Sequence, residues 1–135
     1  METLFIIKPD AVGKGVAIQI TKRIQEKGFR IMGSKTLKLS EEEAGEFYSI
    51  HKGKPFYDEL VEFMTSGEIV VMRLEQEDAV KYLRKVVGAT NPSNASPGTI
   101  RRDFGTSVCA NAVHASDSDE NANREIAFFF KRLPA

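Results

Sequence analysis

Cysteine and histidine are scarce in this sequence, with one Cys and two His among 135 residues. The lone Cys109 cannot form an internal disulfide, and one cysteine with two histidines makes a poor zinc site. Cys109 lies in an apolar stretch, so we expect an inert, buried thiol. Few cysteines are typical of a reducing compartment, and we therefore expect a cytoplasmic protein.

An excess of charge of either sign is also missing, because Lys plus Arg and Asp plus Glu each number 19. Zero net charge argues against a protein whose main task is to coat nucleic acid or an anionic membrane. We expect no obligate nucleic-acid partner. A small basic pocket remains compatible with this balance.

Long apolar runs are absent near the N-terminus, where only the four residues from Leu4 to Ile7 are consecutively apolar. A secretory signal needs a longer stretch and a membrane helix needs about 20 residues, so we expect neither. The sequence shows no internal repeat, low-complexity tract or linker. We expect residues 1–135 to form a single domain of ordinary globular composition.

Apolar periodicity predicts alternating strands and helices. Ser40 and Glu43 have the spacing of a capping box, Gly28 suits the position after a helix, and Pro55 suits the first position of one. Strands are expected at 3–9, 29–39, 68–74 and 108–114. Helices are expected at 16–27, 40–48, 55–64 and 76–87, and from about Asp119 onward.

The order of these elements predicts the fold class. A helix between the first two strands and another between the last two is the split βαβ pattern of a ferredoxin-like sandwich. We therefore expect an α+β protein with a four-stranded antiparallel sheet and helices packed on it. The pattern names no reaction.

A long segment at 88–106 separates the fourth predicted helix from the last predicted strand. It is rich in Pro, Gly, Asn, Ser and Thr, and loops of this length in small domains are usually functional or disordered. Thr90, Arg101 and Arg102 lie within it. Their presence favours a functional loop.

His114 is the first candidate for chemistry, since the sequence contains no P-loop, dinucleotide-binding, nucleophile-elbow or HExxH motif. It ends a predicted strand beside the long loop, and a histidine is largely neutral and nucleophilic near pH 7. The roles of nucleophile, base and ordinary structural donor all stay open from these residues alone.

Three cations lie where elements end or loops begin. Lys8 ends the first strand, Arg84 lies late in the helix at 76–87, and Arg101 lies in the long loop. Each alone is more often a solvated surface charge. If they converge in space they would bind a strongly anionic ligand, because the arginine fork suits phosphate oxygens.

Four segments of the sequence, in order and register, resemble the nucleoside diphosphate kinase family: "IIKPDAV", "HKGKPFYDELVEFMTSG", "GATNP" with "PGTIRRDFG", and "NAVHASDS". The resemblance extends from Thr3 to Phe130. It implies a ferredoxin-like sandwich, in agreement with the order of elements. It also implies ping-pong transfer of the γ-phosphate of a nucleoside triphosphate, typically ATP, to a nucleoside diphosphate, with broad base specificity.

The resemblance identifies His114 as the nucleophile, phosphorylated on Nδ1. It implies that Lys8 contacts the transferring phosphate and the ribose 3′-hydroxyl. It also implies that Arg84, Thr90 and Arg101 hold the phosphates against their accumulated charge.

The remaining roles concern the nucleoside and the orientation of the nucleophile. By resemblance, Asn111 bonds to the sugar, and Phe56 and Val108 pack on opposite faces of the base. Tyr48 is expected behind the nucleophile, with Ser116 and Glu125 orienting the imidazole. These last three complete the set of expected site residues.

The family also implies a Mg²⁺ cofactor, held mainly by nucleotide phosphates and water rather than by protein ligands. Asp117 either touches that hydration shell or caps the last helix. His51 is expected to be structural. Family members form homo-oligomers, and for this chain with its short, bacterial-type C-terminus we favour a tetramer over a dimer or hexamer.

Ala115 departs from the commonest family pattern, which has glycine beside the nucleophile. Alanine would be costly if φ were positive there, but we expect it to be tolerated. The alternative to an enzyme is a non-catalytic ferredoxin-like domain that binds a small ligand. Such a domain would not need all of these polar residues together. A secondary role in DNA binding has no support from the net charge.

Overall fold

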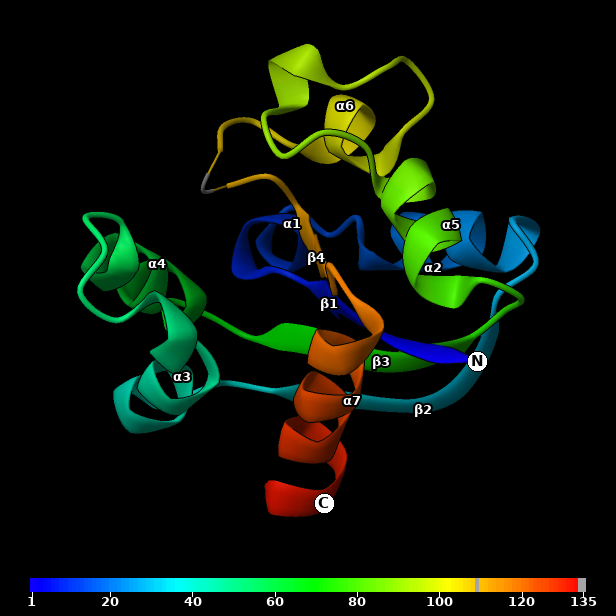
Figure 1. Ribbon diagram of the computed structural model, residues 1–135. Helices are drawn as coiled ribbons and strands as arrows, with labels where there is room; N and C mark the ends of the chain where they lie inside the picture. Colours follow the sequence, from blue (N-terminus) through cyan, green and yellow to red (C-terminus); the bar gives the residue numbers. More distant parts are fainter. Residues whose placement is uncertain (109, 134–135) are drawn as a thin grey trace.

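The computed structural model describes residues 1–108 and 110–133, and the prediction for Cys109 lies outside them. A four-stranded antiparallel sheet has the order β2-β3-β1-β4 (Figure 1). Its strands are β1 (Glu2–Ile7), β2 (Arg30–Leu37), β3 (Ile69–Glu75) and β4 (Val113–Ala115). Because β1 and β2 both run antiparallel to β3, they are parallel to each other with β3 between them. The predicted split βαβ fold is confirmed.

Seven α-helices and three short helical turns are present in the described part of the chain. The α-helices are α1 (Pro9–Gly13), α2 (Ala17–Glu26), α3 (Glu41–Phe47), α4 (Tyr57–Met64), α5 (Ala79–Val87), α6 (Ile100–Phe104) and α7 (Asp119–Ala127). The 3₁₀ turns are η1 (Ser49–His51) and η2 (Pro92–Asn94), and η3 (Phe128–Arg132) is a π-helical turn that continues α7. None of these helices is long and apolar enough to cross a membrane.

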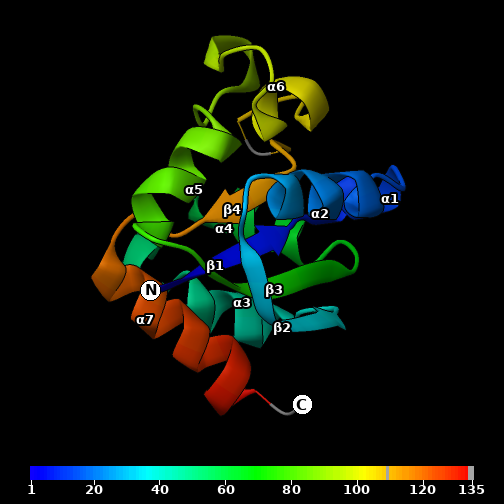
Figure 2. The same ribbon diagram turned by 90° about the vertical axis from the view of Figure 1, so that its right-hand side faces the viewer.

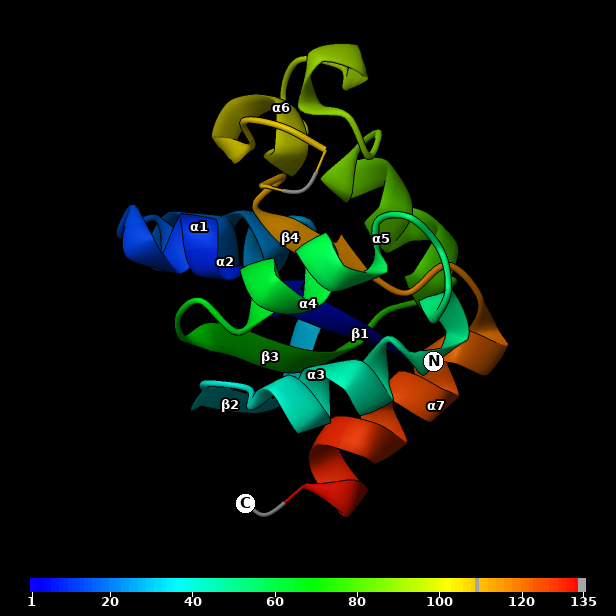
Figure 3. The ribbon, with the colours of Figure 1, turned by 90° about the vertical axis from the view of Figure 1, so that its left-hand side faces the viewer.

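Alternating residues of β1 supply the core on both faces of the sheet, as the two-residue period of a strand requires. Phe5 and Ile7 pack with α2 and α5 on one face, which Figure 2 brings forward. Leu4 and Ile6 pack with α3, α4 and the aromatic residues after α7 on the other face, seen in Figure 3. β1, which is buried from Thr3 to Ile7, is therefore the central support for the strand beside it, β4.

Local signals set several helix ends as predicted. The Ser40 Oγ accepts the Glu43 N–H at 3.1 Å while the Glu43 carboxylate accepts the Ser40 N–H at 2.9 Å, which completes a capping box. Gly28 follows the C-cap of α2 with φ of +87°. This left-handed conformation is the one that glycine adopts without steric cost.

Two predicted helix starts are wrong, and the predicted loop contains short helices. Pro55 does not begin a helix, because α4 starts at Tyr57 with Phe56 as its N-cap. The helix predicted from residue 76 starts at Ala79, since Asp78 adopts a left-handed φ of +53° that a helix cannot contain. The loop at 88–106 contains η2 and α6, and the Thr99 side chain caps α6 by accepting the Arg102 N–H.

The fourth strand is shorter than the predicted 108–114 and covers only Val113–Ala115. Ala112 interrupts it with φ of +75°, a conformation that leaves the extended region. Ala115 ends the strand opposite Phe5 and does not have a positive φ. The methyl group of Ala115 therefore causes no backbone strain beside His114.

Candidate functional site

His114 lies in the middle of β4, opposite Ile6 of β1, and is half-buried. Its Nε2 is 2.8 Å from Oε1 of Glu125, a buried carboxylate on α7. The Ser116 hydroxyl donates to the same oxygen at 2.7 Å. A carboxylate can only accept, so it selects the tautomer with the proton on Nε2 and leaves the lone pair on Nδ1.

The charge of Glu125 depends on these two neighbours. Burial by itself would raise the pKa of this carboxyl, but the hydrogen bonds from His114 and Ser116 and the charges of His114 and Arg124 outweigh it. They hold the pKa of Glu125 below its ordinary value. Glu125 is therefore ionised at neutral pH and can stabilise positive charge on the imidazole.

A cavity of about 530 Å³ opens beside His114. Ten of the eleven predicted site residues line it, and the eleventh, Ser116, lies behind Glu125. The lining residues among those predicted are Lys8, Tyr48, Phe56, Arg84, Thr90, Arg101, Val108, Asn111, His114 and Glu125. These residues are spread along the chain from Lys8 to Glu125, so the tertiary fold brings them together.

Lys8 and Asn111 both line the cavity, and their side chains are hydrogen-bonded to each other. The buried Lys8 Nζ donates to Asn111 Oδ1 at 2.8 Å, and Asn111 Nδ2 donates to the Thr90 carbonyl at 3.0 Å. The ammonium at the end of β1 is thus joined to the chain that follows α5. A buried, oriented cation of this kind favours an anionic ligand.

Arg101 is held by backbone carbonyls on two sides. Its Nη1 donates to the Gly88 carbonyl at 3.1 Å and its Nη2 to the Val113 carbonyl at 3.0 Å. Burial and, secondly, the nearby charge of Arg84 lower the pKa of Arg101 to about 10. The guanidinium stays protonated at neutral pH, so Arg84, Arg101 and Lys8 together bring positive charge to the lining of the cavity.

The apolar part of the cavity lies at its mouth. Phe56 is 46% exposed and Val108 is 56% exposed, although both are large and hydrophobic. Deeper in, Tyr48 packs edge-on against Phe47, whose ring in turn meets the His114 ring at a centroid distance of 5.8 Å. An exposed aromatic ring and an exposed aliphatic side chain on one cavity suit the faces of a planar ligand.

The structure adds cavity residues that sequence reasoning did not assign to the site. His51, expected to be structural, lies on the cavity wall with its ring centroid 5.4 Å from that of Phe56. Burial and the charge of Lys54 lower the pKa of His51. His51 is the last residue of the 3₁₀ turn η1, and no local signal in the sequence predicted this turn. The other added lining residues are Ile50, Glu59, Leu60, Ala115 and Asn121. Asp117, for which a place beside the Mg²⁺ hydration shell was one of two predicted alternatives, also lines the cavity.

Asp117 does not cap α7, because Ser118 is the N-cap and its side chain accepts the Asn121 N–H. The Asn121 side chain donates to Asp117 Oδ1 at 2.6 Å. That hydrogen bond, offset in part by burial and aided by the charges of Arg84 and His114, lowers the pKa of Asp117. Asp117 is therefore an ionised carboxylate on the cavity wall. Within residues 1–108 and 110–133, no three His, Cys, Asp or Glu side chains are grouped to hold a metal ion.

The chain matches a protein-family model and curated relatives over nearly its whole length. The family model described as "Nucleoside diphosphate kinase" matches residues 1–134. The chain is 58% identical over 131 residues to the nucleoside diphosphate kinase of Campylobacter fetus subsp. fetus, covering 97% of this chain and 96% of the relative. It is 53% identical over 131 residues to that of Persephonella marina, covering 97% and 94%.

Solved structures agree in fold. The nucleoside diphosphate kinase of Aquifex aeolicus superposes with a TM-score of 0.95 at 47% identity, covering 96% of this chain and 94% of that one. The enzyme of Halobacterium salinarum, in complex with CDP, superposes with a TM-score of 0.93 at 41% identity, covering 97% and 88%. Both likenesses extend over nearly the whole chain.

Proposed function

The chain belongs to the nucleoside diphosphate kinase family, and we propose that its kinase reaction passes through a phosphohistidine at His114. One observation carries this proposal. Glu125 engages Nε2 of His114, so the lone pair of Nδ1 is available on a ring that lines the same cavity as Lys8, Arg84 and Arg101. A nucleophile and the cations that would neutralise a polyphosphate therefore share one space.

The proposed reaction has two half-reactions. In the first, Nδ1 attacks the γ-phosphorus of a nucleoside triphosphate, typically ATP, and the bond from that phosphorus to the β–γ bridging oxygen breaks. A nucleoside diphosphate leaves with that oxygen's electron pair. In the second, a terminal phosphate oxygen of another nucleoside diphosphate attacks the same phosphorus and the P–N bond breaks. Glu125 stabilises the cationic ring between the two steps.

The cations and Thr90 would hold the phosphates. Lys8, oriented by Asn111, would meet the transferring phosphoryl group and the ribose 3′-hydroxyl, while Arg84, Arg101 and the Thr90 side chain would bind the remaining phosphate oxygens. Positioned cations stabilise the charge spread over the oxygens in phosphoryl transfer without reorganisation of water.

The nucleoside would bind at the apolar mouth. Phe56 would stack on one face of the base, Val108 would pack on the other, and Asn111 would bond to the sugar. Stacking is tolerant of base identity, because every base has a π-face. Broad base specificity follows, and a relative of similar structure was solved in complex with CDP.

A Mg²⁺ ion would enter with the nucleotide. The donor set fits such an ion, because the ionised Asp117 offers one carboxylate on the cavity wall and Mg²⁺ commonly keeps several waters beside one or two carboxylates and the substrate phosphates. When bound, the ion would neutralise phosphate charge. Tyr48 and Ser116 would act behind the nucleophile, by packing and by holding Glu125.

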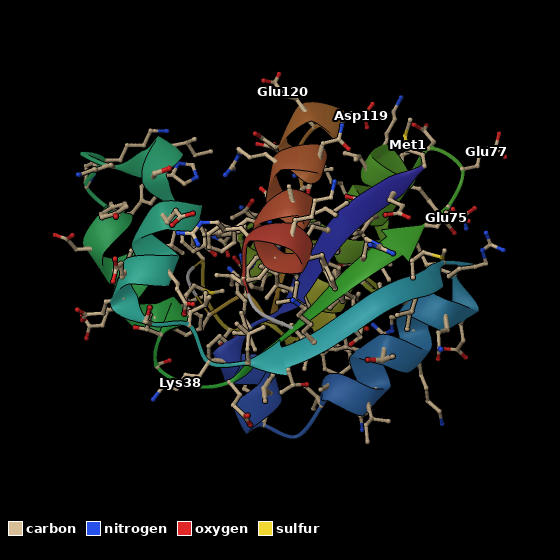
Figure 4. The ribbon with its side chains drawn as sticks, turned by 90° about the horizontal axis from the view of Figure 1, so that it is seen from below. Met1, Lys38, Glu75, Glu77, Asp119 and Glu120 are labelled. Atoms are coloured by element: carbon tan, nitrogen blue, oxygen red, sulfur yellow. The ribbon has the colours of Figure 1, made fainter. Side chains whose placement is uncertain are left out.

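We also propose a homo-oligomer, with a tetramer favoured. The edge strand β2 pairs only with β3 among the described strands, and Figure 4 follows it along the sheet from the end near Glu75 to the end near Lys38. Met32 on β2 and Ile18 on α2 are large exposed apolar side chains. Unpaired strand edges and exposed apolar groups are common contact surfaces between copies. We further propose that residues 1–135 act as one domain and that the protein is cytoplasmic.

A non-catalytic ligand-binding domain is the other class of function considered, and the geometry does not favour it. Binding alone would need the cations and the apolar mouth. It would not need a histidine whose tautomer is set by a buried carboxylate, itself held by a serine hydroxyl. The family comparisons point the same way.

The test is direct phosphorylation. Incubation with γ-labelled ATP and Mg²⁺ is expected to leave an acid-labile, base-stable phosphate on the wild-type chain and none on His114→Ala. The matched control is His51→Ala, which removes the only other histidine and must keep the label whatever its turnover. A His114→Ala variant that transferred phosphate to GDP at the wild-type rate would contradict the proposal.

A further inference from the structure

Ala112 has a backbone conformation that alanine rarely adopts. Its φ is +75°, and the Val113 N–H donates to the Asn111 carbonyl at 2.9 Å across it. A hydrogen bond between residues two apart with positive φ at the centre is a γ-turn of the strained kind. The turn lies between Asn111, which holds the Lys8 ammonium, and His114, two residues further on. Strain is thus placed between two residues of the site.

Both polar backbone groups of Ala112 are held from outside the turn. The Ala112 N–H donates to Oδ2 of Asp10 at 3.0 Å, and its carbonyl accepts the Lys8 N–H at 2.8 Å. Asp10 and Lys8 flank Pro9, where β1 passes into α1. The junction after β1 therefore clamps the segment that leads into β4. The side chain of Asp10 supplies half of that clamp.

The opposite side of the turn is closed by backbone. A Cβ added at Gly105 would lie 3.1 Å from the Asn111 Cα and 2.7 Å from the Arg101 carbonyl, so the chain after α6 packs directly against the turn. Asn111 and Ala112 are themselves buried. With so little free space, the turn has few alternative positions while Asp10 is present. Loss of the clamp would let Ala112 relax to negative φ and move its neighbours.

We infer that Asp10 is a positioning residue for phosphoryl transfer: its carboxylate holds the strained turn at Ala112 and thereby sets where the His114 imidazole meets the phosphate. The inference rests on the proposed role of His114. Asp10 does not line the cavity, so it acts through the backbone and touches no substrate. Small misplacements of a nucleophile cost rate because the reacting atoms must meet in line at close range.

The first test compares three variants in single-turnover phosphorylation by ATP. Asp10→Ala is expected to lower the maximal rate about tenfold or more, while the ATP concentration at half-maximal rate changes about threefold or less. Asp10→Asn keeps an acceptor oxygen for the Ala112 N–H and is expected to recover most of the rate. Asp58→Ala is the control, because Asp58 takes the same second position in α4 and is exposed.

The second test relieves the strain instead of restoring the clamp. Glycine adopts positive φ without steric cost, so Asp10→Ala combined with Ala112→Gly is expected to regain a large part of the rate lost by Asp10→Ala. A helix-end or general folding role of Asp10 predicts no such rescue. Should Asp10→Ala not fold, Asp10→Asn and the double variant still test the clamp through their rates.

The outcomes separate this inference from the function itself. Absence of phosphohistidine in the wild-type chain overturns the proposed function. Normal phosphohistidine in the wild type with an unchanged maximal rate in Asp10→Ala overturns the role of Asp10 alone. A rate in the double variant as low as that of Asp10→Ala also overturns it.

Discussion

Glu125 Oε1 is the atom on which the orientation of His114 depends, because it accepts from both the imidazole and the Ser116 hydroxyl. Sequence reasoning expected this trio by resemblance, and the structure brings its members within hydrogen-bond distance. Their roles in catalysis stay predictions. Spacing alone did not show the pairing, since eleven residues separate His114 from Glu125 along the chain.

The lowered pKa of Glu125 predicts a pH dependence of stability. The folded state holds this carboxyl ionised more strongly than the unfolded chain does, so the unfolded chain binds more protons at acid pH. Its stabilising contribution is complete above the ordinary pKa of 4.5 and is lost as pH falls through the lowered value. Urea unfolding from pH 7 to pH 3 should show Glu125→Gln losing less free energy of unfolding than the wild type. Parallel curves would contradict this.

At the scale of elements, the segment from α5 to α6 positions Arg101. Gly88 ends α5 with φ of +91° and its carbonyl accepts from Arg101, while Thr99 caps the helix that carries this arginine. The composition of 88–106 predicted a functional loop but not its helical turns. These turns depend on the Thr99 cap and on the packing of Ile100 in the core. Amino-acid composition predicts neither of these contacts.

Gly88→Ala should therefore displace Arg101. The added Cβ would lie 2.7 Å from Cβ and Oγ1 of Thr99, and the positive φ adds strain of about 1–3 kcal/mol. Gly98→Ala is the matched control, because Gly98 has φ of +89° but, beyond its two chain neighbours, no atom of the described residues lies within 4 Å of its Cβ position. We expect both variants to lose stability in thermal unfolding, and only Gly88→Ala to lose most of its turnover. Equal turnover in the two variants would contradict the link to Arg101.

The fourth strand shows where element prediction fails. The apolar residues of 108–114 suggested a continuous strand, yet only Val113–Ala115 pairs with β1. The reason is the positive φ of Ala112, held by Asp10 from a distance of 102 residues along the chain. No local sequence pattern predicts an alanine with positive φ, because the steric cost of that conformation is offset by tertiary contacts.

At the scale of the whole molecule, the edge of β2 opposite β3 pairs with no other strand of the described residues, and β2 and α2 carry exposed apolar side chains. Both features support the proposed assembly. Light scattering is expected to give a solution mass about four times that of one chain, as for a tetramer with closed symmetry. Met32→Glu, which places a charge on the edge strand, should lower that mass. A monomeric wild type, or a mass unchanged in Met32→Glu, would contradict this contact surface.

By itself the sequence determined the succession of strands and helices, the capping box at Ser40 and the split βαβ fold. Through family resemblance it also predicted a set of site residues. The elements and the capping box follow from periodicity and local hydrogen bonding, which act between near neighbours. Only the tertiary structure decided the convergence of the cations, the inward turn of His51 and the clamp on Ala112. Such contacts join residues as far apart as Lys8 and Asn111, 103 positions along the chain, and their geometry exists only once the sheet has brought β1 and β4 together.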